Sequence, residues 1–250
     1  MSSGENIQCG ECSGRMQLST GSLELQGMVM KASPAGEYDR RITLLTKERG
    51  KITAFARGAR RMQSALSAAT VPFALGTFRL YEGRSAYTCV SAQISEYFEK
   101  LKTDFTGACY GAYFMEFADY YAQENLEAGD MLNLLYVSLL ALGIDAIPDE
   151  RVRYAFEVRL MVMSGEFPTD ITQEENLMPA SRQAFYHMIT SPLKKLFSFE
   201  VTDPVMREIR ERQDRIRCRQ IDRSFHSLEV LDSMERVLNI HLKNDIIAQP

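Results

Sequence analysis

The spacing of apolar side chains changes near residue 97, and this change divides the chain into two parts. In the first part, apolar and polar residues alternate in short runs between turns that carry glycine or proline, which predicts β-strands. The predicted strands cover residues 23–32, 41–46, 51–57, 77–81 and 86–94. Five such strands favour a small barrel, and the long connection at 57–76 is compatible with a five-stranded OB-fold.

Helical periodicity dominates the second part, where apolar residues recur every three or four positions. The predicted helices cover residues 105–121, 129–142, 149–164 and about 202–222, and a last helix begins near Ser227. Gly165 and Pro168 end the third helix, and residues 166–180 are predicted to form a loop.

These patterns together predict an α+β chain with three segments. Residues 1–21 form a disordered tail, residues 22–97 an N-terminal OB-fold β-barrel, and residues 98–250 a mainly α-helical domain. No run of about 18 apolar residues predicts a membrane span. The first twenty residues also lack the basic start and apolar core of a secretory signal, so a cytoplasmic location is expected.

The net charge of −4 conceals opposite charges in the two parts. Residues 22–95 carry eleven lysines and arginines against five acidic residues, a net charge of +6, whereas residues 96–250 carry −9. A basic barrel favours a polyanion such as nucleic acid as its ligand. The acidic helical part repels phosphate and is better suited to protein partners.

Alternation along the barrel strands places cations beside aromatic rings. It groups Phe55 with Lys51 and Arg57, Tyr81 with Arg79, and Tyr87 with Cys89, Ser91 and Gln93. Cations that follow phosphates and rings that stack on bases are what single-stranded nucleic acid requires. The predicted DNA-binding residues are Lys31, Arg40, Arg41, Lys47, Lys51, Phe55, Arg57, Arg60, Arg61, Arg79 and Tyr81.

Two simpler interpretations remain open for this surface. In the first, Phe55 and Tyr81 are packing residues among solvated charges. In the second, the segment 57–64 is a solvated loop instead of a phosphate-binding arm.

A second basic stretch, residues 206–223, has seven arginines against four acidic residues. Pairs three or four residues apart neutralise one another on a helix, which favours a surface helix over a second DNA contact.

Catalytic and metal-binding motifs are missing from the sequence, so we expect neither an enzyme nor a cofactor. Cys9 and Cys12 form half of a zinc site, but no second pair of ligands follows. The sequence contains neither a GxxxxGK[ST] nor a GxGxxG phosphate loop, and the three histidines are not spaced as metal ligands. A metal-dependent nuclease that uses carboxylates of the helical part is the remaining enzymatic alternative.

Residues 25–73 resemble the RecO family of recombination mediators. The resemblance rests on the segment Gly36-Glu37-Tyr38-Asp39-Arg40, on Gly58-Ala59-Arg60 and on Pro72-Phe73, in order and at family spacing. YAFEVRLMVMSGEFP (154–168) and HSLEVL (226–231) extend the similarity into the helical part. Many family members carry a four-cysteine zinc module after the Gly-x-x-Pro element, but residues 169–185 contain no cysteine, so no zinc is expected.

The resemblance implies a nucleoid-associated mediator of DNA repair and homologous recombination. Such a protein binds single- and double-stranded DNA, anneals complementary strands, and works with RecR and single-stranded-DNA-binding protein to load RecA. The alternatives are an OB-fold RNA-binding protein and an adaptor for acidic protein tails. The tail of single-stranded-DNA-binding protein is itself acidic, and the residues predicted to bind it are Arg151, Arg153 and Arg159. In the simpler interpretation, these arginines pair with nearby carboxylates of the same helix.

Overall fold

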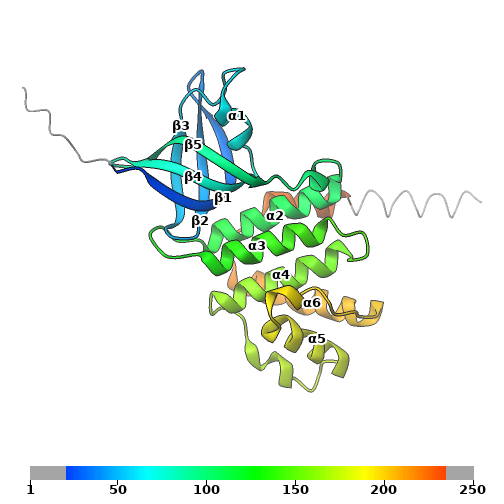
Figure 1. Ribbon diagram of the computed structural model, residues 1–250. Helices are drawn as coiled ribbons and strands as arrows, with labels where there is room; N and C mark the ends of the chain where they lie inside the picture. Colours follow the sequence, from blue (N-terminus) through cyan, green and yellow to red (C-terminus); the bar gives the residue numbers. More distant parts are fainter. Residues whose placement is uncertain (1–20, 235–250) are drawn as a thin grey trace, which may run out of the picture.

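The computed structural model describes residues 21–234. A β-barrel sits on one end of a stack of helices (Figure 1). The predictions for the N-terminal tail, including Cys9 and Cys12, and for the last helix beyond residue 234 lie outside the described residues.

The barrel contains the five predicted strands. They are β1 (Leu23–Ala35), β2 (Asp39–Thr46), β3 (Gly50–Ala56), β4 (Leu75–Glu82) and β5 (Tyr87–Glu96). The strand order is β1-β2-β3-β5-β4; β4 pairs back onto β1, and β3 runs parallel to β5. This closed topology confirms the predicted fold class, and the long connection carries the short helix α1 (Ala65–Ala69).

The prediction for the fifth strand was wrong in one respect. Cys89 is buried with Leu80 as its partner, whereas Ser91 and Gln93 are exposed, so the three do not share a face. The register of β4 against β5 shifts between Arg79 and Leu80, which adds a residue to β5. A bulge of this kind moves the following side chains to the opposite face, and strict alternation does not anticipate it.

Three of the helices match their predicted bounds to within one residue. They are α2 (Phe105–Tyr121), α3 (Gly129–Leu142) and α4 (Asp149–Met163). The helix α6 (Asp203–Gln220) is slightly shorter than expected, and residues 226–234 are helical as predicted.

The helix α5 (Pro179–Thr190) was not predicted, and a 3-10 turn (Thr169–Gln173) lies within the expected loop. Two shorter 3-10 turns, Glu99–Lys102 and Leu193–Lys195, complete the described elements. The apolar residues of α5 gather in its second half, and its buried hydrophobic face consists of Ala184, Phe185 and Met188. This short stripe is a weak periodic signal.

The joint between barrel and helices is made mostly of backbone. The turn between β2 and β3 ends at Gly50, whose φ of +62° suits glycine. A Cβ atom there would lie 2.2 Å from the carbonyl oxygen of Gln123 in the α2–α3 loop. The amide of Lys51 donates to that carbonyl at 2.9 Å, and the amide of Ala128 donates to the carbonyl of Lys47 at 2.9 Å. The hairpin therefore has a fixed position against the helices.

The apolar core of the helical part reaches into the barrel. Met28, Met30 and Leu45 of the barrel belong to the same buried cluster as the aromatic residues of α2 and α4. In that cluster the rings of Phe114 and Phe156 stack with centroids 4.3 Å apart. The central helix α4 is buried on nearly all sides.

A buried carboxylate lies at the centre of this core. Glu157 of α4 has no exposed surface, and the guanidinium of Arg153 donates to it at 2.9 Å. The hydroxyl of Tyr113 on α2 and the side-chain amide of Gln213 on α6 donate at 2.7 and 3.1 Å. Three helices thus share one anion, and each donor compensates part of its desolvation.

We expect the substitution Arg153→Met to lower the free energy of unfolding by about 3 kcal/mol, because the buried carboxylate of Glu157 loses its nearest counter-ion and keeps only Arg217, 4.0 Å away. Urea unfolding monitored by circular dichroism measures this loss. The control is Arg207→Met on the exposed surface of α6. Equal stabilities for the two variants would contradict the role of the pair Arg153–Glu157. Adding Glu157→Met to the Arg153→Met variant should recover much of the lost stability, because it removes the buried charge.

Candidate nucleic-acid interface

A row of exposed cations and rings crosses the outer face of the barrel. Arg41 on β2 is the direct partner of Phe55 on β3, Phe55 is the partner of Thr88 on β5, and Thr88 is the partner of Tyr81 on β4. Phe55 is 37% exposed, Arg41 is exposed, and Thr88 and Tyr81 are half-buried. The buried residues that alternate with them are Ile42, Ala54, Ala56, Leu80 and Cys89. Directly opposed side chains lie about 5 Å apart at Cβ, so the row is continuous.

The row leads to one end of the barrel, which we call the tip, made of residues 36–39 and 57–63. The carboxylate of Asp39 accepts from the amide of Gly58 at 2.7 Å, and the amide of Arg60 donates to the carbonyl of Tyr38 at 2.9 Å. The guanidinium of Arg60 also donates to the carbonyl of Gly36 at 3.0 Å. These bonds join the β1–β2 turn to the segment after β3.

Three predicted arginines are exposed at the tip. Arg57 and Arg60 point from the segment that follows β3, and the guanidinium carbon of Arg61 lies 5.0 Å from the ring centroid of Tyr38. A cation over a ring is favourable at this distance and limits the motion of both side chains. The tip therefore presents a fixed cluster of positive charge.

Arg40 has a different environment from its neighbours. Its guanidinium is half-buried and donates to the carbonyl of Ser67 at 2.7 Å and to the hydroxyl of Thr70 at 3.1 Å. These bonds hold α1 and the connection that follows it against the barrel. Arg40 therefore ties the connection to the barrel through Nη1, and these bonds limit how far its side chain can turn toward a ligand on the outer row.

Lys31 and Lys51 are engaged by the helical part. Their ammonium groups lie 2.6 and 3.4 Å from the carboxylate of Asp119 on α2, and Arg223 lies 3.8 Å from it. Partial burial opposes ionisation of Asp119, but the hydrogen bonds and charges of the two lysines outweigh it and lower its pKa. A lowered pKa means that the pair stabilises the fold above the ordinary aspartate pKa of about 4, and that this contribution is lost as pH falls through the lowered value.

Lys47 and Arg79 lie away from the row. Lys47 is in the β2–β3 turn, at the end of the hairpin opposite the tip. Arg79 is exposed on β4, where its side chain donates to the hydroxyl of Ser22 at 3.2 Å and its cross-strand partner is Glu24. Of the eleven predicted residues, six share one continuous surface: Arg41, Phe55, Arg57, Arg60, Arg61 and Tyr81.

The three arginines predicted to bind an acidic tail do not form a common surface. Arg153 is buried against Glu157 and bonds to Asp214 at 3.1 Å. Arg159 donates to the carbonyls of Met188 and Ser191 at the end of α5. That prediction is corrected here: residues two turns apart share a helix face, but α5 and α6 cover this face of α4 and use the charges internally.

Arg151 differs from the other two. Its guanidinium lies over the ring of Phe199, 5.8 Å from the centroid, and its Nε is buried without a hydrogen-bond partner among the described residues. A single arginine held in this way does not make a pocket for a peptide.

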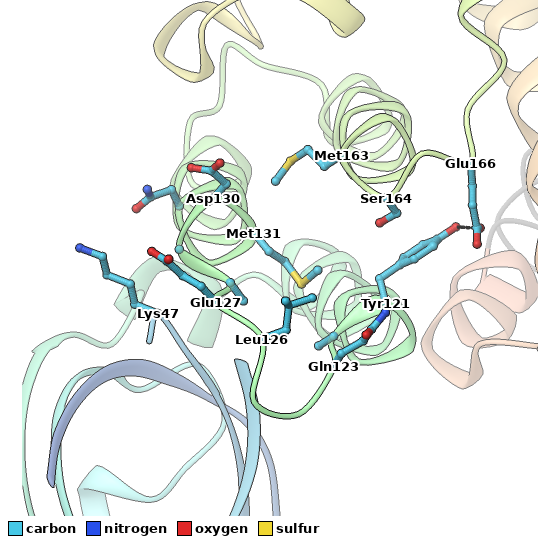
Figure 2. Close-up of a pocket in the computed structure, with 14 residues that line it drawn as sticks. Lys47, Tyr121, Gln123, Leu126, Glu127, Asp130, Met131, Met163, Ser164 and Glu166 are labelled. Carbon is cyan, nitrogen blue, oxygen red and sulfur yellow. Dashed lines mark hydrogen bonds between the residues drawn. The ribbon is translucent and has the colours of Figure 1, made fainter. Parts of the chain in front are cut away.

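A groove of about 990 Å³ lies beside the barrel, between the α2–α3 loop and the ends of α3 and α4 (Figure 2). Leu126, 57% exposed, and Met163, 39% exposed, give it an apolar lining. Its carboxylates belong to Glu127, Asp130 and Glu166, against the single ammonium group of Lys47. This negative rim repels phosphate, so the groove is not part of the nucleic-acid interface.

Sequence reasoning missed two residues of this surface, Tyr38 and Met62, and also Asp119, which holds two of the predicted lysines away from it. Tyr38 is in a turn and Met62 in the connection, where strand alternation says nothing about exposure. Asp119 is on a helix 88 residues from Lys31, so no local pattern pairs them. Within residues 21–234, no group of histidines, cysteines and carboxylates is arranged to hold a metal, and no helix is long and apolar enough to cross a membrane.

Comparisons with known proteins place this chain beside one family. Residues 19–98 match the family model described as Recombination protein O N terminal. The chain is 28% identical to DNA repair protein RecO of Acetivibrio thermocellus, in an alignment that covers 86% of this chain and 98% of that protein.

Two further relatives are similar over a shorter stretch. DNA repair protein RecO of Alkaliphilus metalliredigens is 36% identical over 58% of this chain and 59% of its own. The RecO protein of Symbiobacterium thermophilum is 33% identical over 58% of this chain and 57% of its own. These two alignments span less than two thirds of the relatives. The resemblance to the RecO family is confirmed.

We expect the substitution Asp119→Asn to strengthen binding to heparin, used here as a polyanion, because it removes the carboxylate that balances Lys31 and Lys51. Lys31 gains the most freedom, since Lys51 keeps its bond to the backbone carbonyl of residue 119. Elution from a heparin column should require more salt than for the unmodified protein. Asp170→Asn makes the same change of charge at an exposed position of the helical part and serves as the control. Equal shifts for the two variants would show that only total charge matters.

Proposed function

We propose that this chain, whose resemblance to the RecO family is confirmed, is a non-enzymatic DNA-binding protein of DNA repair and recombination. The relatives that support a role in repair are named DNA repair protein RecO. The observation that carries the proposal is the continuous surface from Tyr81 through Phe55 and Arg41 to the arginines of the tip. It combines the two chemistries that a strand of nucleic acid offers, phosphates and base faces.

Arginine suits this surface because its guanidinium group makes two parallel hydrogen bonds to a phosphate and also stacks on rings. Arg41, Arg57, Arg60 and Arg61 would follow the backbone of a strand. The ring of Phe55 would support a base beside Arg41. A duplex offers only phosphates to such a surface, so double-stranded DNA would bind through the arginines alone.

Annealing of complementary strands follows from the same contacts. Two strands repel each other through their phosphates, and bound guanidinium groups reduce this repulsion. A strand that is held by its backbone keeps its Watson–Crick edges free for pairing. We therefore infer that the barrel promotes annealing by neutralising charge, without a catalytic residue.

Protein partners would use the helical part, which carries the opposite net charge. The proposed partners are RecR and single-stranded-DNA-binding protein, and RecA would be loaded indirectly. The tip and the groove beside Lys47 lie at opposite ends of the β2–β3 hairpin, so a protein in the groove would not displace DNA from the tip. The carboxylates of the groove disfavour the acidic tail of single-stranded-DNA-binding protein and favour a partner segment with basic side chains.

We expect the triple variant Arg57→Ala, Arg60→Ala, Arg61→Ala to weaken binding to single-stranded DNA and to reduce its salt dependence. Each phosphate contact contributes a slope of about −0.7 to a plot of log affinity against log salt, so three lost contacts change the slope by about 2. Fluorescence anisotropy titrations at several salt concentrations measure both quantities.

A matched control removes the same charge from the helical part. Arg207, Arg215 and Arg219 are exposed on α6, and the corresponding triple alanine variant should keep its slope. A salt-independent affinity, or equal losses in the two triple variants, would overturn the assignment of the DNA surface to the barrel.

The complete function is tested by annealing. The purified protein should accelerate pairing of complementary strands coated with single-stranded-DNA-binding protein, and the barrel triple variant should not. If the protein binds DNA but anneals neither bare nor coated strands, it is a DNA-binding protein and the mediator role is overturned. Preference for RNA over DNA of the same sequence would instead favour an RNA-binding function.

A further inference from the structure

Two large apolar side chains are exposed at the tip among the arginines. Met62 is fully exposed, and Tyr38 is 46% exposed. They lie on the two segments that the tip joins, the β1–β2 turn and the connection after β3. Single exposed apolar residues are common on proteins, but here both adjoin Arg60 and Arg61 in a basic cluster.

The backbone beneath these side chains is held by hydrogen bonds. The amide of Arg61 donates to the carbonyl of Gly58 at 3.0 Å, and the amide of Ser64 donates to the carbonyl of Arg61 at 3.1 Å. Together with the bonds between the two segments described above, they close successive turns around Met62. The exposure of Met62 therefore follows from a defined turn geometry.

The acidic groups of the tip are already engaged. Asp39 accepts the amide of Gly58. Tyrosine has an ordinary pKa of about 10, so the hydroxyl of Tyr38 is protonated and the ring is neutral at neutral pH. A hydrogen bond to Glu37 raises this pKa further. The cation of Arg61 covers one face of that ring. The remaining exposed surface of Tyr38 is a neutral aromatic surface beside a positive charge.

Phosphate binding does not require either side chain, since arginines alone supply the donors. An unbranched, polarizable methionine and an aromatic ring are instead suited to the faces of bases: rings stack on them, and methionine is one of the side chains that wedge between base steps. We propose that the tip is a base-contacting site, in which Tyr38 stacks on one nucleobase and Met62 inserts beside it. This inference rests on the proposed DNA-binding function.

The position of the tip supports nucleic acid over an apolar protein surface as its ligand. Arg57, Arg60 and Arg61 are exposed on the same segment as Met62, and Arg61 lies over the ring of Tyr38. Phe55 precedes this segment by two residues, so the row ends beside it. A strand lying on this row would bring a phosphate and a base to the tip together. Inserting a side chain between stacked bases also opens them, which would help a bound strand to shed secondary structure before pairing.

The test compares two ligands that share phosphates but differ in bases: a single-stranded oligonucleotide and an abasic oligonucleotide of equal length. The full-length protein should bind the natural strand about tenfold more tightly, within the range that one stacked base contributes. In the double variant Tyr38→Ala, Met62→Ala this preference should fall to the part that Phe55 supplies, while affinity for the abasic strand is kept. The conservative variant Tyr38→Phe, Met62→Leu should retain the preference.

The possible outcomes separate this inference from the function on which it rests. If the unmodified protein binds both strands equally, the tip contacts phosphates alone, the inference is overturned, and DNA binding stands. If it binds neither strand, the proposed function itself fails. If the double variant loses affinity for both strands in parallel, the two side chains serve the structure of the tip, and this also overturns the inference.

Discussion

The attachment of the β2–β3 hairpin to the helical part determines how this molecule presents its charges. Backbone hydrogen bonds from Lys47 and Lys51 to the α2–α3 loop hold one end of the hairpin. Asp119 adds ion pairs to Lys31 and Lys51. With one end fixed to an acidic body, the opposite end of the hairpin, the tip, is left exposed to solvent.

This arrangement divides the basic residues of the barrel by chemistry. The two lysines nearest α2 balance a carboxylate, for which a compact ammonium charge is sufficient. The arginines lie along the outer row and at the tip, where planar guanidinium groups suit phosphates and rings. The net charge of +6 that marks the barrel in the sequence therefore overstates the charge available to a ligand.

Part of the candidate site was accessible from the sequence. Alternation along β3 and β4 correctly placed Phe55, Arg57 and Tyr81 outward, because a strand that lines a packed barrel must bury every second side chain. The same reasoning failed on β5, where a bulge changes the facing residues. It failed again on α4, where periodicity cannot show that Arg153 is buried by α6.

The sequence by itself determined the five strands and all the longer helices except α5, since hydrophobic periodicity reflects which faces must leave water. It also indicated the family through short motifs in order. Tertiary structure alone decided which charges remain free. Lys31 meets Asp119, Arg40 meets Ser67 and Arg159 meets Met188 across separations of 88, 27 and 29 residues. Pairings at such distances depend on how whole elements pack, and no local pattern of residues encodes them.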